Sequence, residues 1–485
     1  MKQNSRFLKV LNGSVILTVC FLFWLQLSRI YVGDIKVDDF EHLASAWWIF
    51  NGYEPYRDFF QHHNPLFWYV IQPFFYLFEN PLEVYVALRY FACFCYLVIL
   101  LSVALIIRQL SGNIQTIVYA FLLYMAYPII SGAYIQGRPD LPMMACLLFG
   151  IYFWIRFFKA HKTIFLILCY FSFFLSFAFL QKVVLFFVPF GIYQLYLLCK
   201  KELPWKDVGM ALILPVLITV GYGVYLYRMG MLWRYIELNW ILNLHYFRDY
   251  QMYRLTIYDW VFHILFGLFL IYGFWKRKGL DRQLLLVLFG FSALFFLTVK
   301  PYRYYYMMFA PFMAVVIAFG IENLKKEYLK ILFILFGLTC GVFSFYTRLN
   351  FRDSPVVYPF MEYFKDLEKL NDEDWIDYNA PPTFALYQKR PRQYYWYNWA
   401  RGALWDIHLF HRHQLQNWNT WIYQTKPAVI IGSYVRDLMQ VPDDDKKADR
   451  FMQLDEDFLK KYYNGPETEF EVYRLKERKS DGASK

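Results

Sequence analysis

Long apolar runs recur along this chain from Leu11 to about Tyr346, and they limit what it can fold into. A helix of about 20 apolar residues is long enough to cross the hydrocarbon core of a bilayer. Hydrophobic residues make up 58% of the 485 residues. Charged residues make up only 18%, against about 25% in soluble domains. We therefore expect a polytopic α-helical membrane protein rather than two or three soluble domains.

The apolar runs predict about eleven membrane-spanning helices. The N-terminal run follows basic residues, as in a signal peptide, but the first alanine is Ala44, so no A-x-A cleavage site follows the run. We therefore expect a retained helix with a cytoplasmic N-terminus. The predicted helices lie near residues 11–31, 84–107, 114–131, 141–158, 163–180, 183–199, 208–227, 256–275, 283–299, 303–321 and 329–346.

Basic residues gather in the short connections that follow the second, fourth, sixth, eighth and tenth predicted helices. These connections hold Arg108 and the segments "RFFKAHK", "CKKELPWK", "FWKRKGLDR" and "ENLKKEYLK". Short basic loops stay on the cytoplasmic side, so we attribute the net charge of +11 to membrane topology and not to nucleic-acid binding. The first loop, residues 32–83, and the C-terminus then lie outside the cytoplasmic (inner) membrane.

Two regions do not fit the pattern of spanning helices. The segment "NPLFWYVIQPFFYLF" is short and carries two prolines, so we expect an interfacial helix on the outer face. After about Tyr346 the chain becomes charged, which predicts a transmembrane domain over 1–346 and a soluble extracytoplasmic α/β domain over 347–485. In that second domain "KPAVIIGSYV" predicts a buried strand and "ETEFEVYRL" an edge strand. "PFMEYFKDLEKL" and "DRFMQLDEDFLKKYY" predict helices.

The first loop opens with a dense group of ionisable residues, Asp38, Asp39, Glu41 and His42. The acids can simply cap a helix and complement its dipole. Charge at membrane depth, however, tends to be functional. A carboxylate here can act as general base toward a hydroxyl or amine acceptor. Alternatively, the acids can hold a divalent cation against a phosphate.

Further candidates lie at other predicted outer ends. His62 and His63 can be metal ligands, phosphate-contacting cations or packing groups. Asp140 in "GRPD" can act beside Arg138, or it can cap the fourth predicted helix. Basic residues on the outer side oppose the positive-inside trend, so a phosphate partner is plausible for them. The basic residues of this kind are Lys182, Lys300 and Arg303.

Five segments together carry a resemblance to known proteins: "DDFEHLASAWWIFNG", "PYRDFFQHHNPLFWY", "LRYFACFCYLVILLSVALIIRQLSG", "GRPDLPMM" and "PYRYYYMMFAPF". On these motifs, residues 1–346 resemble the GT-C superfamily of polytopic glycosyltransferases. The similarity is to the family of protein O-mannosyltransferases and lipid A aminoarabinose transferase. Those families open with Asp-Glu and continue with His-Pro-Pro-Leu. Here the first pair is Asp38-Asp39, and the later motif begins His63-Asn64.

The resemblance implies a reaction. A polyprenyl- or dolichyl-phosphate sugar, either a hexose or a pentose, is transferred to an acceptor glycan, lipid or protein on the outer side. The anomeric carbon is usually inverted, and a first-loop acid, Asp38 or Asp39, serves as base. Metal dependence varies across the superfamily, so a divalent cation stays open and no organic cofactor is implied. The residue patterns and the resemblance together predict catalysis by Asp38, Asp39 and Asp140, donor phosphate binding by Arg89, Arg138, Lys182, Lys300 and Arg303, and a supporting or metal role for Glu41, His42, His62 and His63.

Two other classes compete with an enzyme. A transporter or flippase of a lipid-linked glycan would also have many helices and outer cations. Transporters usually carry internal repeats and charges near the bilayer midplane, whereas this chain shows no repeat and few charges in the middle of its helices. A structural membrane scaffold would not explain the acids of the first loop.

The topology is testable by reporter fusions. Fusions after Arg108, Lys201 and Lys278 should report the cytoplasm, because they follow basic connections. Fusions after Tyr134 and Asp353 should report the outer side. A cytoplasmic C-terminal domain would contradict the assignment, because the first-loop acids and the C-terminal region must share a compartment.

Overall fold

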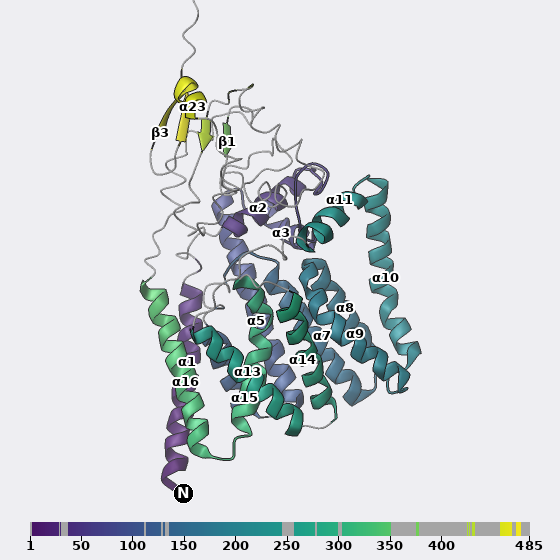
Figure 1. Cartoon of the computed structure of the whole chain (residues 1–485), viewed down its shortest axis with the longest axis vertical. Coiled ribbons are helices and arrows are strands. Elements are labelled where there is room, and N and C mark those ends of the chain that lie inside the picture. The colour runs from purple at the N-terminus through teal and green to yellow at the C-terminus, as the bar shows by residue number, and fades with distance from the viewer. Residues whose placement is uncertain are drawn as a thin grey trace, which may run out of the picture.

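The computed structural model describes residues 2–28, 30, 37–110, 113–127, 130, 135–244, 257–276, 279–298, 303–350, 375–377, 424, 426, 429–431, 456–467 and 472–476. Most of these residues are helical (Figure 1). A helix stands at each of the eleven predicted places. These helices are α1 (Lys2–Ser28), α5 (Pro81–Leu110), α6 (Ile114–Ala126), α7 (Asp140–Ala160), α8 (Thr163–Phe179), α9 (Val184–Cys199), α10 (Trp205–Arg228), α13 (Ile257–Lys276), α14 (Leu280–Thr298), α15 (Ala310–Glu322) and α16 (Glu327–Asn350).

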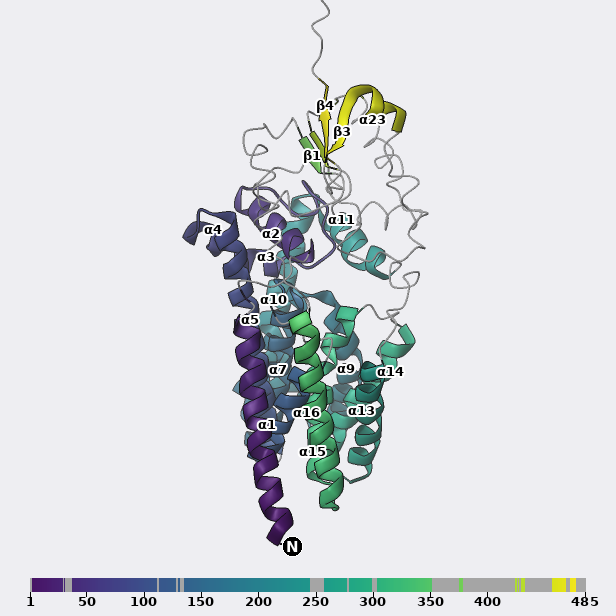
Figure 2. The same ribbon diagram turned by 90° about the vertical axis from the view of Figure 1, so that its left-hand side faces the viewer.

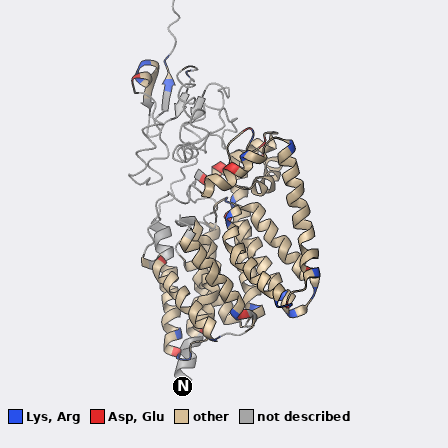
Figure 3. Ribbon diagram, turned by 45° about the vertical axis from the view of Figure 1, so that its right-hand side comes forward, with Lys and Arg blue, Asp and Glu red and all other residues tan. Residues whose placement is uncertain are grey.

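Five helical segments of the described residues are long and apolar enough to cross a membrane: Val10–Ser28, Pro81–Leu110, Asp140–Ala160, Gln181–Cys199 and Trp205–Arg228. Other helices are apolar but shorter, among them α6, α8 and α15. Lys, Arg, Asp and Glu lie mainly near helix ends, and the shafts are largely free of charge (Figure 3). The chain is therefore a multi-pass membrane protein, and the crossing of the membrane by all eleven helices stays a prediction.

Aromatic rings fill the space between the helices. Phe186 of α9 stacks on Phe312 of α15 with ring centroids 5.8 Å apart, and Phe291 of α14 stacks on Phe309 at 4.5 Å. Such pairs add to the packing energy of large apolar side chains. Other large apolar side chains face outward, such as Leu217 on α10, which is 64% exposed. An apolar outer surface of this kind matches a lipid environment.

One end of the bundle carries short helices and turns. These are α2 (Val37–Phe50), α3 (Leu66–Ile71), α4 (Pro73–Leu77), α11 (Leu232–Ile236), the π-helical segment η3 (Glu237–Leu242) and the 3₁₀ segments η2 (Gln181–Val183) and η4 (Arg303–Met308). In both views α2, α3 and α11 lie at the end of the bundle opposite the N-terminus (Figures 1 and 2). We call this the loop end.

The predicted interfacial helix is divided into α3 and α4 at Gln72. Pro73 begins α4 and has no N–H group to continue the hydrogen-bond ladder of α3. Helix α2 begins with two acids in its first turn, which complement the helix dipole. It ends at Phe50, and Gly52, two residues later, has a positive φ of 86° that suits glycine. Its buried residues include Phe40 and Leu43.

The described C-terminal residues form one four-stranded sheet with the order β1-β2-β4-β3. Its elements are β1 (Trp375–Asp377), β2 (Val429–Ile431), β3 (Tyr463–Glu467), β4 (Val472–Leu475) and the helix α23 (Glu456–Tyr462). Strands β1 and β2 are parallel, and the other pairings are antiparallel. These strands lie beyond the loop end (Figure 1).

The strand predicted in "KPAVIIGSYV" is confirmed by β2, and α23 covers part of one predicted helix. The prediction of an edge strand in "ETEFEVYRL" is wrong, because β4 lies between β2 and β3. Alternating polarity reports that one face of a strand is covered, but it does not report whether both edges are hydrogen-bonded. The helix predicted in "PFMEYFKDLEKL" lies outside the described residues, and a separate soluble α/β domain over 347–485 stays a prediction.

Candidate functional site

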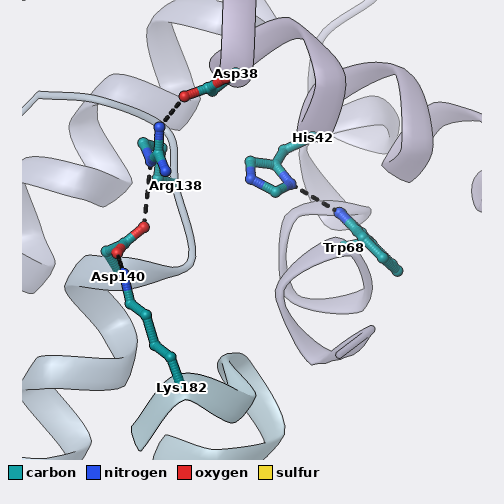
Figure 4. Close-up of polar contacts among 6 residues, drawn as sticks. All are labelled: Asp38, His42, Trp68, Arg138, Asp140 and Lys182. Atoms are coloured by element: carbon teal, nitrogen blue, oxygen red, sulfur yellow. Dashed lines mark hydrogen bonds and ion pairs between the residues drawn. The ribbon is translucent and has the colours of Figure 1, made fainter. Parts of the chain in front are cut away.

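Four charged side chains of alternating sign are joined in a row at the loop end. Arg138 contacts Asp38 of α2 and donates from Nε to Oδ2 of Asp140 at 3.2 Å. Lys182 of η2 contacts Asp140 from the other side. Figure 4 shows the row Asp38, Arg138, Asp140, Lys182, which we call the four-charge row. Segments far apart in the sequence therefore meet here, as expected for residues at the outer ends of different helices.

Exposure differs strongly between the members of the four-charge row, being lowest at Asp140 and highest at Asp38. The side chains of Asp140 and Lys182 are 2% and 9% exposed, that of Arg138 is 15% exposed and that of Asp38 is 32% exposed. Burying an ion is costly unless it is paired, and the alternation of signs gives each buried charge a partner. Asp38 is the member of the row that solvent or a substrate reaches most easily.

Local structure holds the middle of the row. Asp140 is the first residue of α7, where the helix dipole favours a carboxylate. Gly137 permits the preceding turn to pack against Leu88 of α5, because a Cβ atom at this position would overlap that side chain. Lys182 lies in the short η2 segment between α8 and α9, and its ammonium group also lies 4.7 Å from the centre of the Tyr305 ring.

A second polar group lies beside the first turn of α2. Asp39 is fully buried and accepts a hydrogen bond from the Tyr85 hydroxyl at 3.3 Å. Arg89 donates to the same hydroxyl at 2.6 Å and to the carbonyl of Ile30 at 3.0 Å. Arg89 is itself buried. The structure thus places Asp39 and Arg89 together, in a group that ties α2 to α5 and to the chain after α1.

Three histidines form a third group. The rings of His62 and His63 are 3.8 Å apart, and His42 of α2 lies 5.5 Å from His63. Burial, together with the charge of His42, lowers the pKa of His62 to about 3. Burial also lowers the pKa of His42 and of His63, where the charges of Asp140 and Lys182 act in opposite directions. These imidazoles are therefore neutral near pH 7, and His63 lies within electrostatic reach of the four-charge row.

Partners of these residues include side chains that the sequence analysis did not single out. Trp68 donates from Nε1 to Nδ1 of His42 at 3.1 Å, and Tyr85 and Tyr305 contact the other two groups. The "YRYYYMM" run places several tyrosines at this end of the bundle. Which of them lies against Lys182 depends on tertiary packing, and the structure shows that it is Tyr305. Arg303 begins η4, two residues before Tyr305, and its side chain lies outside the described part of the structure, as does Lys300.

Known proteins share this architecture. Residues 62–222 match the sequence model of the family described as dolichyl-phosphate-mannose-protein mannosyltransferase. No curated protein matches the chain in sequence. The crystal structure of ArnT from Cupriavidus metallidurans bound to undecaprenyl phosphate has a similar fold, with a TM-score of 0.64 over 96% of this chain and 98% of that chain, at 10% identity. The chain has a GT-C fold.

The resemblance to GT-C glycosyltransferases that the motifs carry is thereby confirmed. Within the GT-C fold, the family match begins at His62 and ends in α10. It contains three members of the four-charge row, Arg138, Asp140 and Lys182, but not Asp38. The roles of the individual residues stay predictions.

The coupling between Asp140 and Lys182 is testable by stability measurements. Lys182→Met should destabilise the protein by about 3 kcal/mol, because it removes one partner of a buried ion pair. The double variant Asp140→Asn/Lys182→Met should recover a large part of this loss, since neither residue then carries an unpaired charge. Thermal unfolding of the purified variants in detergent measures both effects. Equal or greater destabilisation in the double variant would contradict the coupling.

Proposed function

We propose that this protein transfers a sugar from a polyprenyl-phosphate donor to an acceptor on the outer face of the cytoplasmic membrane. Two likenesses support the reaction class: the mannosyltransferase family match over residues 62–222, and the shared fold with ArnT, whose crystal structure contains undecaprenyl phosphate. The observation that carries the proposal is the four-charge row, in which an accessible carboxylate is followed by Arg138 and Lys182.

The row contains the groups that an inverting transfer requires. Asp38, at its exposed end, accepts the proton of the acceptor hydroxyl or amine. The acceptor atom then forms a bond to the anomeric carbon from the face opposite the phosphate. The bond between that carbon and the phosphate oxygen breaks, and its electron pair stays with the phosphate. The leaving phosphate gains negative charge, which nearby Arg138 and Lys182 stabilise.

Exposure supports Asp38, rather than its neighbours, as the proposed base. A base must come within hydrogen-bond distance of the acceptor, and the side chain of Asp38 is 32% exposed. Asp39 is fully buried beside Tyr85. Asp140 is held between two cations and is 2% exposed, so we give it the role of orienting Arg138 and Lys182. The positive charge of Arg138 favours the ionised form of the Asp38 carboxylate, which is the form that can accept a proton.

The base is testable by conservative substitution. Asp38→Asn keeps the shape but removes the proton acceptor, so turnover should fall by at least about 100-fold. Asp39→Asn should lose less, because Asp39 is buried in the second polar group. Glu83→Gln, an exposed acid in the first turn of α5, is the matched control and should keep wild-type turnover. The measurement is the initial rate with a polyprenyl-phosphate sugar, alongside a thermal melt. If folded Asp38→Asn and Asp39→Asn variants both turn over at wild-type rates, the first loop is not the catalytic centre, and the transporter hypothesis gains support.

Donor binding gives an independent test. Lys182→Ala and Arg303→Ala should raise the apparent KM for the donor by roughly tenfold or more, because a charged hydrogen bond to phosphate contributes about 1.5–3 kcal/mol. Lys326→Ala removes a cation from the connection between α15 and α16 and should leave KM unchanged. Kinetics are normalised to the folded fraction. Unchanged KM in both Lys182→Ala and Arg303→Ala would remove these residues from the donor site.

A further inference from the structure

Glu41 and two histidines of the third group have no role in the proposed transfer. Glu41 of α2, His62 and His63 each offer one ligand atom, and these atoms all lie within 4.8 Å of one another. Glu41 and His62 are buried, with 6% and 8% of their surface exposed. We propose that Glu41, His62 and His63 bind a divalent transition-metal ion of the zinc class.

The donor set suits zinc. Two imidazole nitrogens and one carboxylate oxygen bind Zn²⁺ at about 2.0–2.2 Å, and sites with three protein ligands keep a further position for water or substrate. Imidazole ligands favour zinc and similar transition metals over Mg²⁺ and Ca²⁺, which prefer oxygen. The Nδ1 atom of His63 is buried and has no hydrogen-bond partner among the residues that the structure describes, so a lone pair or proton of this ring is available to a ligand.

The main chain of the two histidines is held in place by distant parts of the protein. The carbonyl of His62 accepts hydrogen bonds from Gln181 at 2.7 Å and from Asn243 at 2.9 Å. The carbonyl of His63 accepts one from the Tyr56 hydroxyl at 2.6 Å. Metal sites depend on such outer contacts to orient their ligands. Pairs of packed surface histidines need no such support.

The next residue continues this pattern. The Asn64 side chain donates to the carbonyl of Phe177 at 2.6 Å and accepts from the Tyr235 hydroxyl at 2.8 Å. On the other side, Gln61 donates to Ser45 of α2 at 2.7 Å. This contact fixes the distance between the histidines and the helix that carries Glu41. Protein contacts therefore hold α2, which carries Glu41, beside His62 and His63 without the help of an ion.

His42 is excluded from the ligand set by its hydrogen bond. Its Nδ1 accepts a hydrogen bond from the Trp68 indole, so in the neutral ring the proton lies on Nε2. A protonated nitrogen cannot bind a metal ion. His42 therefore borders the site, and the structure assigns the ligands to Glu41, His62 and His63 alone.

Direct metal measurements test the proposal, and they do not depend on whether the protein transfers sugars. The full chain is purified in detergent, stripped with a chelator, and titrated with Zn²⁺ or with Co²⁺, whose visible ligand-field bands report a site of low coordination number. Wild-type protein should bind about one ion per chain. His62→Gln, His63→Gln and Glu41→Gln should each weaken binding by at least about tenfold. His161→Gln, an exposed histidine at the opposite end of α7, should bind like wild type.

Each outcome decides the proposal. Loss of binding in the three variants with retention in His161→Gln supports it, provided that thermal melts in the absence of metal show that the variants are folded. Absence of a bound ion in the wild type would overturn it, as would equal affinity in the wild type and in folded Glu41→Gln, His62→Gln and His63→Gln. In those cases the two histidines are a neutral packed pair that contributes no metal ligand.

Discussion

The loop end depends on the ion pairs of the buried Asp140 carboxylate. Its side chain is 2% exposed, and it is compensated by Arg138, by Lys182 and by the N-terminus of α7. Lys182 belongs to η2, and Arg138, in the turn before α7, also contacts Asp38 of α2, so the ion pairs of the row link α2, α7 and η2 to one another. The row is electrically balanced within itself. In the proposed transfer, an entering donor phosphate would draw Arg138 or Lys182 partly away from Asp140, and these cations would bind it most strongly when it gains charge in the transition state.

A second set of polar contacts keeps the first loop against the bundle. The amides of Gln181 and Asn243 hold the carbonyl of His62, and Tyr235 holds Asn64. Gln181 precedes Lys182 directly, so the residue that fixes the histidines and the residue that compensates Asp140 lie on the same 3₁₀ turn. A shift of η2 would therefore disturb both groups together. This connection gives a physical reason why the first loop and the α8–α9 connection should act as one rigid unit.

The sequence predicts which site residues lie at the same end of the helices. It does not predict which of them contact one another. Hydropathy and loop charge predicted which residues lie at the same end, and for Arg138, Asp140 and Lys182 this was enough, because all three sit at helix starts. The family resemblance adds Arg89 to the candidates for donor phosphate binding. Arg89 lies two turns inside α5, however, and contacts Tyr85 and Ile30. Which residues of adjacent helices contact one another depends on the rotation of each helix about its axis. The spacing of apolar residues in the sequence does not specify that rotation. The partners Trp68 and Tyr305 were missed for the same reason.

The geometry of α2 explains how one short acidic stretch serves three environments. Successive residues of an α-helix are turned by about 100°. Asp38 and His42 therefore share a side, and Glu41 lies close to that side, whereas Asp39 points to another. Asp38 forms an ion pair with Arg138, and Asp39 accepts a hydrogen bond from Tyr85. Glu41 lies near His62 and His63. A single carboxylate could not combine accessibility with firm attachment to the bundle. Consecutive acids on a helix separate these tasks, because the buried Asp39 anchors the turn from which the exposed Asp38 projects.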